Sequence, residues 1–240
     1  MALSQIADDG AGAEPIFVVT IDGPGGSGKG TVGRRVADRL GWHLLDSGAL
    51  YRLVALAALD AGLPQDDEPG HARLALDLDV TFTADPAGAE VVLLAGKDVT
   101  TRLRTEAAGM TASRVAAMPA VRTALLDRQR AFARSPGLVA DGRDMGTVVF
   151  PNAQLKIYLT ASPEERARRR HKQLKEKGLD VSLAALSQEI RERDHRDSTR
   201  AVAPLRAAED AVVIDSTGTP IGGVVDKILA LVGQRSPAAH

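Results

Sequence analysis

The stretch from Gly23 to Thr31 reads GPGGSGKGT, and it decides the fold of this chain. Its spacing fits G-x-x-x-x-G-K, the pattern of a phosphate-binding loop, although a glycine follows the lysine and the hydroxyl comes one residue later. Glycines let backbone N–H groups turn inward, a helix N-terminus adds partial positive charge, and the lysine reaches the outer phosphates. We name this segment the P-loop. Its candidate phosphate-binding residues are Gly23, Pro24, Gly25, Gly26, Ser27, Gly28, Lys29, Gly30 and Thr31.

The sequence on either side of the P-loop supports this interpretation. Residues 16–21 form an apolar, β-branched run that is typical of a buried parallel strand. Val32, Val36 and Leu40 recur at helical spacing, and Gly41 is a natural helix end. The alternative is a plain glycine turn between a strand and a helix. It is less favoured because strand, lysine, threonine and helix all coincide.

Length and composition limit the classes of protein that this chain can belong to. With 240 residues it can bury one substantial core and carry a small insertion. A formal charge of −1 gives no reason to expect a nucleic-acid polymer or a membrane surface as partner. The absence of cysteine excludes disulfides and thiolate metal sites, and no signal-peptide pattern or apolar run of about 18 residues occurs. We expect a soluble, cytoplasmic monomer.

Short apolar runs alternate with helical patterns along most of the chain. This alternation predicts a doubly wound α/β fold with a five-stranded parallel sheet. The expected domain spans residues 15–232, between a disordered tail at 1–14 and a flexible tail at 233–240. The strands are expected at 16–21, 43–45, 138–141, 155–159 and 212–215.

Two further features interrupt this alternation. Residues 80–83 and 91–94 are β-branched runs around a turn-rich linker, so they predict an antiparallel hairpin inside a small inserted subdomain at about 63–105. Residues 164–200 hold 11 Lys and Arg against 8 acidic residues, and the arginines recur at helical spacing on two faces joined through Gly178. A solvated helix face is the alternative, but we interpret residues 166–200 as a lid that closes over a triphosphate.

Polar residues follow the strands where a doubly wound sheet places its ligands. Asp46 and Ser47 follow one expected strand, and residues 141–144 (DGRD) end another. Because parallel strands carry their carboxyl ends at one edge, we expect these groups to meet the P-loop in one crevice. The five histidines form no ligand pattern, and we assign them no role.

The P-loop form G-x-x-G-x-G-K-G-T resembles that of the nucleoside-monophosphate kinases. Within that group, DSGALYR (46–52), DGRDMGTVVFP (141–151) and ERDHRDSTR (192–200) are similar to strings of the bacterial-type cytidylate kinases. The resemblance runs from about Ile16 to Val232. It implies ATP-dependent phosphorylation of CMP and dCMP with Mg²⁺, and it places an inserted monophosphate-binding subdomain near residues 63–105.

The resemblance also implies a set of site residues. The implied contacts to cytosine are Ser113, Arg122 and Asp144, and those to the sugar are Tyr51, Arg193 and Asp197. The implied contacts to the monophosphate are Arg52, Arg143 and Arg200, and Ser47 also lies on the CMP side. The implied lid contacts to ATP are Arg166, Arg169 and Arg170. We expect Lys29, Arg143, Arg193 and Arg200 to carry catalysis, since phosphoryl transfer needs positioning and charge neutralisation more than covalent chemistry.

Base recognition can be argued from chemistry as well. Cytosine presents an amino donor beside two acceptors, so its reader needs a carboxylate and a pair of donors, as Asp144, Arg122 and Ser113 provide. Asp144 could instead pair with Arg143 or cap its own loop, and Ser113 could be a simple helix cap.

The metal ligands and the function class stay open on the sequence. Mg²⁺ could be held by Thr31, through water, or by Asp141, which could equally cap a local loop. A kinase of UMP or of another small metabolite is the main alternative. A GTPase is disfavoured because no Asn-Lys-x-Asp string occurs, and a nucleic-acid module because the basic region lacks interleaved aromatic residues.

Overall fold

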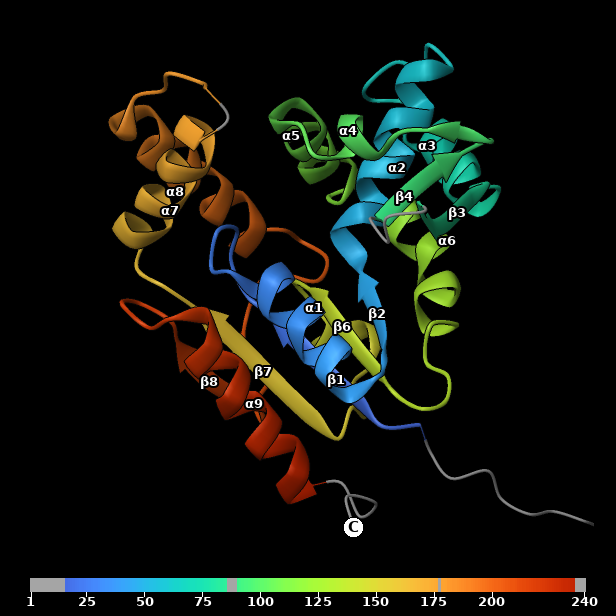
Figure 1. The fold of residues 1–240 in the computed structure, drawn as a ribbon. Helices are drawn as coiled ribbons and strands as arrows, with labels where there is room; N and C mark the ends of the chain where they lie inside the picture. Colours follow the sequence, from blue (N-terminus) through green and yellow to red (C-terminus); the bar gives the residue numbers. More distant parts are fainter. Residues whose placement is uncertain (1–15, 86–89, 177, 236–240) are drawn as a thin grey trace, which may run out of the picture.

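The structure is a computed structural model that describes residues 16–85, 90–176 and 178–235. Its centre is a five-stranded sheet in the order β2-β6-β1-β7-β8, in which every neighbouring pair is parallel (Figure 1). The predicted doubly wound parallel sheet is therefore confirmed. Its strands are β1 (Val18–Asp22), β2 (His43–Asp46), β6 (Leu138–Gly142), β7 (Leu155–Thr160) and β8 (Val212–Asp215).

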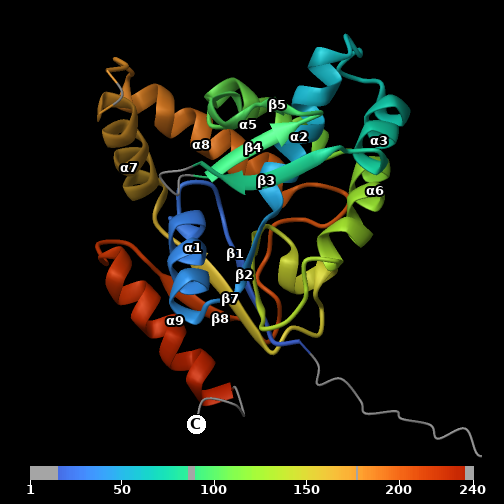
Figure 2. The ribbon, with the colours of Figure 1, turned by 45° about the vertical axis from the view of Figure 1, so that its right-hand side comes forward.

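The two faces of this sheet bury separate apolar clusters. On one face, α1 (Lys29–Leu40) and α9 (Ile221–Arg235) pack side by side and bury Val36 and Ile228 against β1, β6 and β7 (Figures 1 and 2). The other face is covered mainly by α2 (Ser47–Asp60), with α3 (Glu68–Leu76) and α6 (Pro119–Arg130) beyond it. β1 and β6 are buried along their whole length, which explains their continuous apolar sequence.

A second, antiparallel sheet lies beside α2 and supports one wall of the site. Its order is β3-β4-β5, with β3 (Val80–Ala84), β4 (Glu90–Leu94) and β5 (Lys97–Asp98). The strands of the expected hairpin are thus present, although part of the turn lies outside the described residues. The short helices α4 (Thr100–Leu103) and α5 (Glu106–Val115) follow this sheet. Helix α3 falls in a mixed, charged stretch whose sequence did not reveal it.

The basic region forms two helices that stand apart from the second sheet. They are α7 (Pro163–Glu176) and α8 (Leu183–Ser198), and Gly178 in their connection has φ of +76° (Figure 1). A single π-helical turn, Met145–Val149, follows β6. α9 continues to Arg235, past the expected domain end at 232, while the tail expected at 1–14 and residues 236–240 lie outside the described residues.

Gly137 is predicted to be required by packing at the start of β6. A Cβ placed there would lie 2.4 Å from Cδ2 of Trp42, the single tryptophan of the chain. Gly137→Ala should therefore lower the free energy of unfolding by about 1–3 kcal/mol. Urea unfolding followed by Trp42 fluorescence measures the change.

Gly233→Ala is the matched control, because a Cβ at Gly233 meets nothing within 4 Å inside α9. Alanine there should stabilise the helix by up to about 1 kcal/mol. Equal unfolding free energies for the two variants would contradict the packing argument.

Candidate functional site

The P-loop connects β1 to α1 and has the backbone that its glycines predict. Gly26 and Gly28 have φ of +79° and +92°, a region that favours glycine. Gly28 occupies the N-cap position of α1, and no side chain caps the helix there. The first-turn N–H groups of α1 therefore stay available to an anion.

The position after Lys29 explains the unusual form of this P-loop. A Cβ at Gly30 would lie 3.3 Å from Oδ2 of Asp141, the penultimate residue of the neighbouring strand β6. A carboxylate therefore stands beside the place where other P-loops carry a hydroxyl. The Oδ1 atom of Asp141 is buried without a hydrogen-bond partner among the described residues. Burial raises the pKa of Asp141 to about 6, and the charge of Lys29 opposes that rise.

Lys29 lies in a strongly positive environment. Its Nζ donates a hydrogen bond to the Pro24 carbonyl oxygen at 3.3 Å. Burial lowers the pKa of Lys29 to about 7; the charges of Arg143 and Arg193 add to this shift, and Asp141 opposes it. A lysine with its pKa lowered in this way gains its proton back when anionic phosphate oxygens arrive.

Asp144 and Arg122 form a buried ion pair across the crevice. An Nη2 donor of Arg122 binds Oδ2 of Asp144, and its Nη1 binds the Ala116 carbonyl oxygen at 3.2 Å. The guanidinium also lies over the Tyr51 ring, 5.9 Å from its centroid. Asp144 neither pairs with Arg143 nor caps its own π-turn, so both alternatives considered for it are wrong.

Ser113 reaches the same crevice from α5. The helix begins at Glu106 and is capped by Thr105, so Ser113 lies inside it and is not its cap. Its hydroxyl is 3.5 Å from Nη1 of Arg196, which projects from α8. Ser47, in contrast, donates to the main-chain oxygen of Asp141 at 2.8 Å and ties β2 to β6.

Three arginines expected to carry catalysis, Arg143, Arg193 and Arg200, meet around Asp197. Arg143 donates through Nε to Asp197 Oδ2 at 3.0 Å, and Arg200 donates to the Asp197 carbonyl oxygen at 3.3 Å. Within the described part of the chain, Nε of Arg193 and Nη2 of Arg200 are buried without a partner. Burial, followed by the charge of Arg143, lowers the pKa of Arg193 to about 10. Unpaired buried donors of this kind favour an anion beside them.

The arginines of α7 hold the P-loop from the other side. Arg166 pairs with Asp194 of α8 and donates to the Gly25 carbonyl oxygen at 3.1 Å. Arg169 donates to the Ser27 carbonyl oxygen at 3.2 Å. Arg170 lines the cleft, and its pKa is lowered by burial and then by the charge of Arg52.

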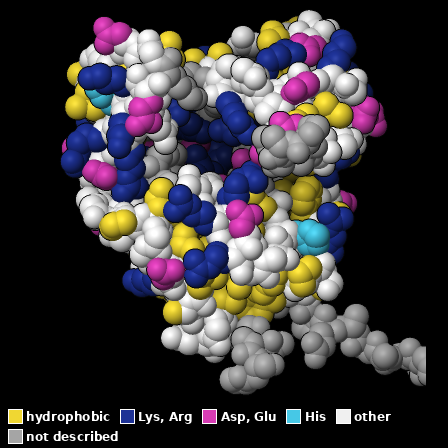
Figure 3. Space-filling model, in the orientation of Figure 1, with side chains coloured by type: hydrophobic (Ala, Val, Ile, Leu, Met, Phe, Trp, Pro, Cys, Tyr) yellow, Lys and Arg dark blue, Asp and Glu magenta, His cyan; other side chains and the backbone are white. Residues whose placement is uncertain are grey.

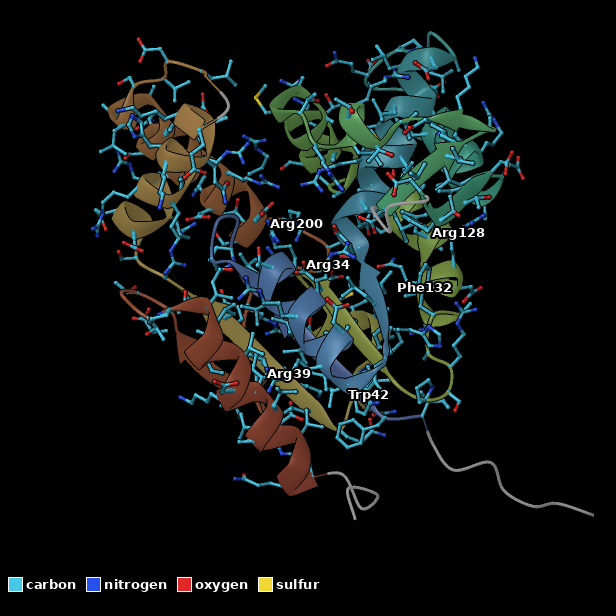
Figure 4. The ribbon with its side chains drawn as sticks, in the orientation of Figure 1. Arg34, Arg39, Trp42, Arg128, Phe132 and Arg200 are labelled. Atoms are coloured by element: carbon cyan, nitrogen blue, oxygen red, sulfur yellow. The ribbon has the colours of Figure 1, made fainter. Side chains whose placement is uncertain are left out.

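One cleft of about 1780 Å³ connects these groups. Lys and Arg side chains line the hollow between the α7–α8 pair and the second sheet (Figure 3). Arg200 lies at its centre, between the end of α8 and α2, and Arg34 projects from α1 near its mouth (Figure 4). The volume exceeds the about 300–1,000 Å³ of a typical single-ligand pocket, so the cleft has room for more than one small ligand.

Sequence reasoning missed two residues that shape this site. Asp22, at the end of β1, accepts hydrogen bonds from the backbone N–H groups of Met145 and Gly146, both at 2.8 Å. Burial raises its pKa to about 7 although both of these bonds lower it. Ser216, after β8, donates to the Ser27 carbonyl oxygen at 3.1 Å. An acidic residue ending a buried strand was a usable signal for Asp22, whereas nothing in the sequence marked Ser216.

Comparison with known proteins decides the family. Residues 19–234 match the family model of cytidylate kinase. The chain belongs to the cytidylate kinase family. It is therefore a phosphotransferase. The predicted resemblance is confirmed.

The relatives match over nearly their full length. A cytidylate kinase from Stutzerimonas stutzeri (strain A1501) is 59% identical over 94% of this chain and 99% of its own length. A cytidylate kinase from Methylococcus capsulatus is 58% identical over 91% of this chain and 98% of its own length. One from Pseudomonas aeruginosa (strain LESB58) is 60% identical over 91% of this chain and 95% of its own length. Within residues 16–85, 90–176 and 178–235, no helix has the length and apolar character needed to cross a membrane.

We predict that ATP binding takes up close to one proton per site at about pH 8. With its pKa at about 7, Lys29 is mostly neutral at this pH, and phosphate oxygens should return the pKa toward its ordinary 10.5. Asp141, with a pKa of about 6, is already ionised and contributes little. Calorimetric titration in two buffers of different ionisation enthalpy measures the uptake.

Lys29→Met is the control, since methionine keeps the length of the side chain without a titrating group. The proton uptake should disappear in this variant. An uptake that is unchanged by Lys29→Met would contradict the assignment of the shifted pKa to this lysine.

Proposed function

We propose that this kinase transfers the γ-phosphoryl group of ATP to CMP and dCMP, giving CDP or dCDP and ADP. The observation that carries the proposal is the continuity of one cleft from the P-loop to the buried Arg122–Asp144 pair. A phosphate donor and a base-bearing acceptor can therefore lie with their phosphates between Lys29 and the arginines around Asp197. The family's name supports the choice of a cytidine nucleotide.

ATP is proposed to bind with its phosphates on the P-loop. The N–H groups of the loop and of the first turn of α1 face the phosphates, and Lys29 reaches the outer ones. Arg166 and Arg169 already bind carbonyl oxygens of the loop, so they keep its backbone in place. Arg170 lines the same cleft and can close on the triphosphate with the lid.

CMP is proposed to bind on the side of α2 and α5. Asp144 accepts from the cytosine amino group while Arg122 and Ser113 donate to its acceptors. Uracil places a carbonyl oxygen where the amino group would lie, so it would face the Asp144 carboxylate with lone pairs opposed. The remaining proposed contacts are Tyr51, Arg193 and Asp197 at the sugar and Arg52, Arg143 and Arg200 at the phosphate, with Ser47 supporting this side.

The transfer step is a displacement at the γ-phosphorus. An anionic oxygen of the monophosphate attacks, the bond to the β-γ bridging oxygen breaks, and ADP leaves with that oxygen. No general base is needed, because the attacking oxygen is already ionised at neutral pH. Lys29, Arg143, Arg193 and Arg200 stabilise the charge that spreads over the transferred group.

The residues around Asp141 fit a hard divalent cation. Its Oδ1 is a buried oxygen without a partner among the described residues, and the Thr31 hydroxyl follows in the first turn of α1. Asp141 and Thr31, directly or through water, would hold Mg²⁺, which would supply charge neutralisation for the phosphates. The described ranges contain no group of three or more His, Cys, Asp or Glu that could hold a metal.

Two parts of the sequence-based description stay predictions. The first is a monomer that acts in the cytoplasm. The second is the division into a monophosphate-binding subdomain at 63–105 and a lid at 166–200. A kinase of UMP or of another small metabolite remains the alternative, and the Arg122–Asp144 pair is the feature that favours cytosine.

Base choice gives the sharpest test of the proposal. We expect kcat/KM for UMP to be at least ~100-fold below that for CMP, since uracil loses a charge-assisted hydrogen bond and gains a repulsive contact. Asp144→Asn should shrink this advantage, mainly because CMP becomes a worse substrate. Coupled ADP-release assays on a panel of ribo- and deoxyribonucleoside monophosphates measure both effects.

Asp38→Asn serves as the control, because Asp38 is exposed on α1. It should leave the CMP/UMP ratio unchanged. If Asp144→Asn also leaves that ratio unchanged, Asp144 does not read the base. Equal use of all monophosphates by the unaltered protein would overturn the proposed substrate.

Closure of the lid can be tested by hydrogen exchange. Residues 166–200 should exchange more slowly when CMP and an unreactive ATP analogue bind together, because the two arginine faces must close to exclude water. Helix α9 after Ile221, which packs against α1 and β7, should change little and is the internal reference. If only Gly23–Thr31 exchanged more slowly, residues 166–200 would be a solvated charged surface and not a lid.

A further inference from the structure

Asp22 links the P-loop to the segment that reads the base. It is the last residue of β1, directly before Gly23, and its side chain is buried. Both carboxylate oxygens are used: Oδ1 accepts from the N–H of Met145, and Oδ2 accepts from the N–H of Gly146. Its carboxylate therefore faces the turn that follows β6, and Asp22 is not among the residues that line the cleft.

The two N–H groups that Asp22 binds are the ones that a helical turn leaves unpaired. Met145 and Gly146 begin the π-helical turn, and the first N–H groups of any helix lack partners within it. The side chain at the N-cap position ordinarily accepts from the second or third N–H of the helix, here that of Gly146 or Thr147, and aspartate is among the preferred caps. Asp144 holds that position here, yet its side chain makes no capping hydrogen bond and binds Arg122 instead.

We infer that Asp22 is a positioning residue for base recognition: it caps the turn in place of Asp144 and so leaves the Asp144 carboxylate free for Arg122 and the base. The inference rests on the proposed function and deepens it. Without the Asp22 carboxylate, the unpaired N–H of Gly146 draws the Asp144 side chain back onto its own turn as an ordinary N-cap. The carboxylate then leaves the crevice, and selectivity for cytosine falls.

Close packing against β1 limits how far the π-helical turn at Met145–Val149 can move. A Cβ at Gly146 would lie 2.8 Å from the Thr20 hydroxyl oxygen, so the turn rests directly on β1. The parallel register also aligns Asp22 with Gly142, at the end of β6 where the segment begins. The sheet therefore holds the Asp22 carboxylate and the N–H groups of Met145 and Gly146 in fixed positions. The residue at position 22 must accept both of these hydrogen bonds.

Asp22→Asn is the first test, since it keeps the size of the side chain while an amide N–H now opposes one of the two backbone donors. We expect kcat/KM for CMP to fall by about 10- to 100-fold and that for UMP to fall much less, so that the CMP/UMP ratio drops by about 10-fold. The KM for ATP should stay within about 3-fold of its original value, because the P-loop contacts of Arg166 and Arg169 are untouched.

Thr20→Val is the matched control on the same strand. Thr20 faces the same turn, but its buried hydroxyl has no hydrogen-bond partner among the described residues. Thr20→Val should keep the CMP/UMP ratio of kcat/KM within about 2-fold of the ratio for the unaltered protein, because it changes the packing under the turn without removing a cap. A comparable loss of selectivity in Thr20→Val would mean that any disturbance under the turn suffices, and it would overturn the inference.

A double-mutant cycle separates positioning from general damage. If Asp22 acts through Asp144, the combined variant Asp22→Asn, Asp144→Asn should show no lower CMP/UMP ratio than Asp144→Asn alone. The inference would be overturned if the double variant lost the sum of the two single effects on the CMP/UMP ratio. It would also be overturned if Asp22→Asn lowered kcat/KM equally for CMP and UMP. If Asp22→Asn does not fold, Asp22→Ala removes the cap without opposing donors and carries the same cycle.

The two proposals fail in different ways. Absence of a CMP preference in the unaltered protein contradicts the proposed function. A normal preference that Asp22→Asn leaves intact contradicts only the positioning role. Amide exchange gives a readout free of substrate: Met145 and Gly146 should exchange faster in Asp22→Asn than in Thr20→Val, and equal rates would overturn the inference.

Discussion

The pairing of cleft arginines with aspartates is the interaction on which the rest of this site depends. Arg122 pairs with Asp144, Arg143 with Asp197, and Arg166 with Asp194. Buried guanidinium groups without anions would be costly, so each pair keeps a cation in the cleft before any phosphate arrives. Each pair also joins two different elements, so charge pairs help to hold the walls of the cleft together.

These pairs leave the cleft short of negative charge. Nε of Arg193 and Nη2 of Arg200 are buried without partners in the described part of the chain. The pKa of Lys29 is lowered first by burial and then by the charge of Arg143, to which Arg193 adds. A ligand rich in phosphate relieves that shortage of negative charge at several points at once. Affinity for phosphate and stabilisation of the transferred group thus have one physical origin.

The sequence predicts the sheet well because its strands are buried on both faces and read as continuous apolar runs. The P-loop follows from glycine geometry and a lysine. Side-chain partners are harder to predict: Asp144 has three nearby ways to satisfy its carboxylate, and only packing selects Arg122. The position of Asp22 at a strand end was a usable signal, but its partners and those of Ser216 are backbone atoms more than 100 residues away, which no local pattern encodes. Helix α3 was missed because its apolar face is weak and charged residues surround it.

The contact between Ser216 and Ser27 has a consequence for how the protein is made. The P-loop is encoded near the start of the chain, yet its backbone is held by a hydroxyl that follows the outermost strand, β8. A ribosome produces these partners 189 residues apart. Because domains form as synthesis proceeds, the emerging chain carries an unfinished phosphate loop until its last strand has joined the sheet.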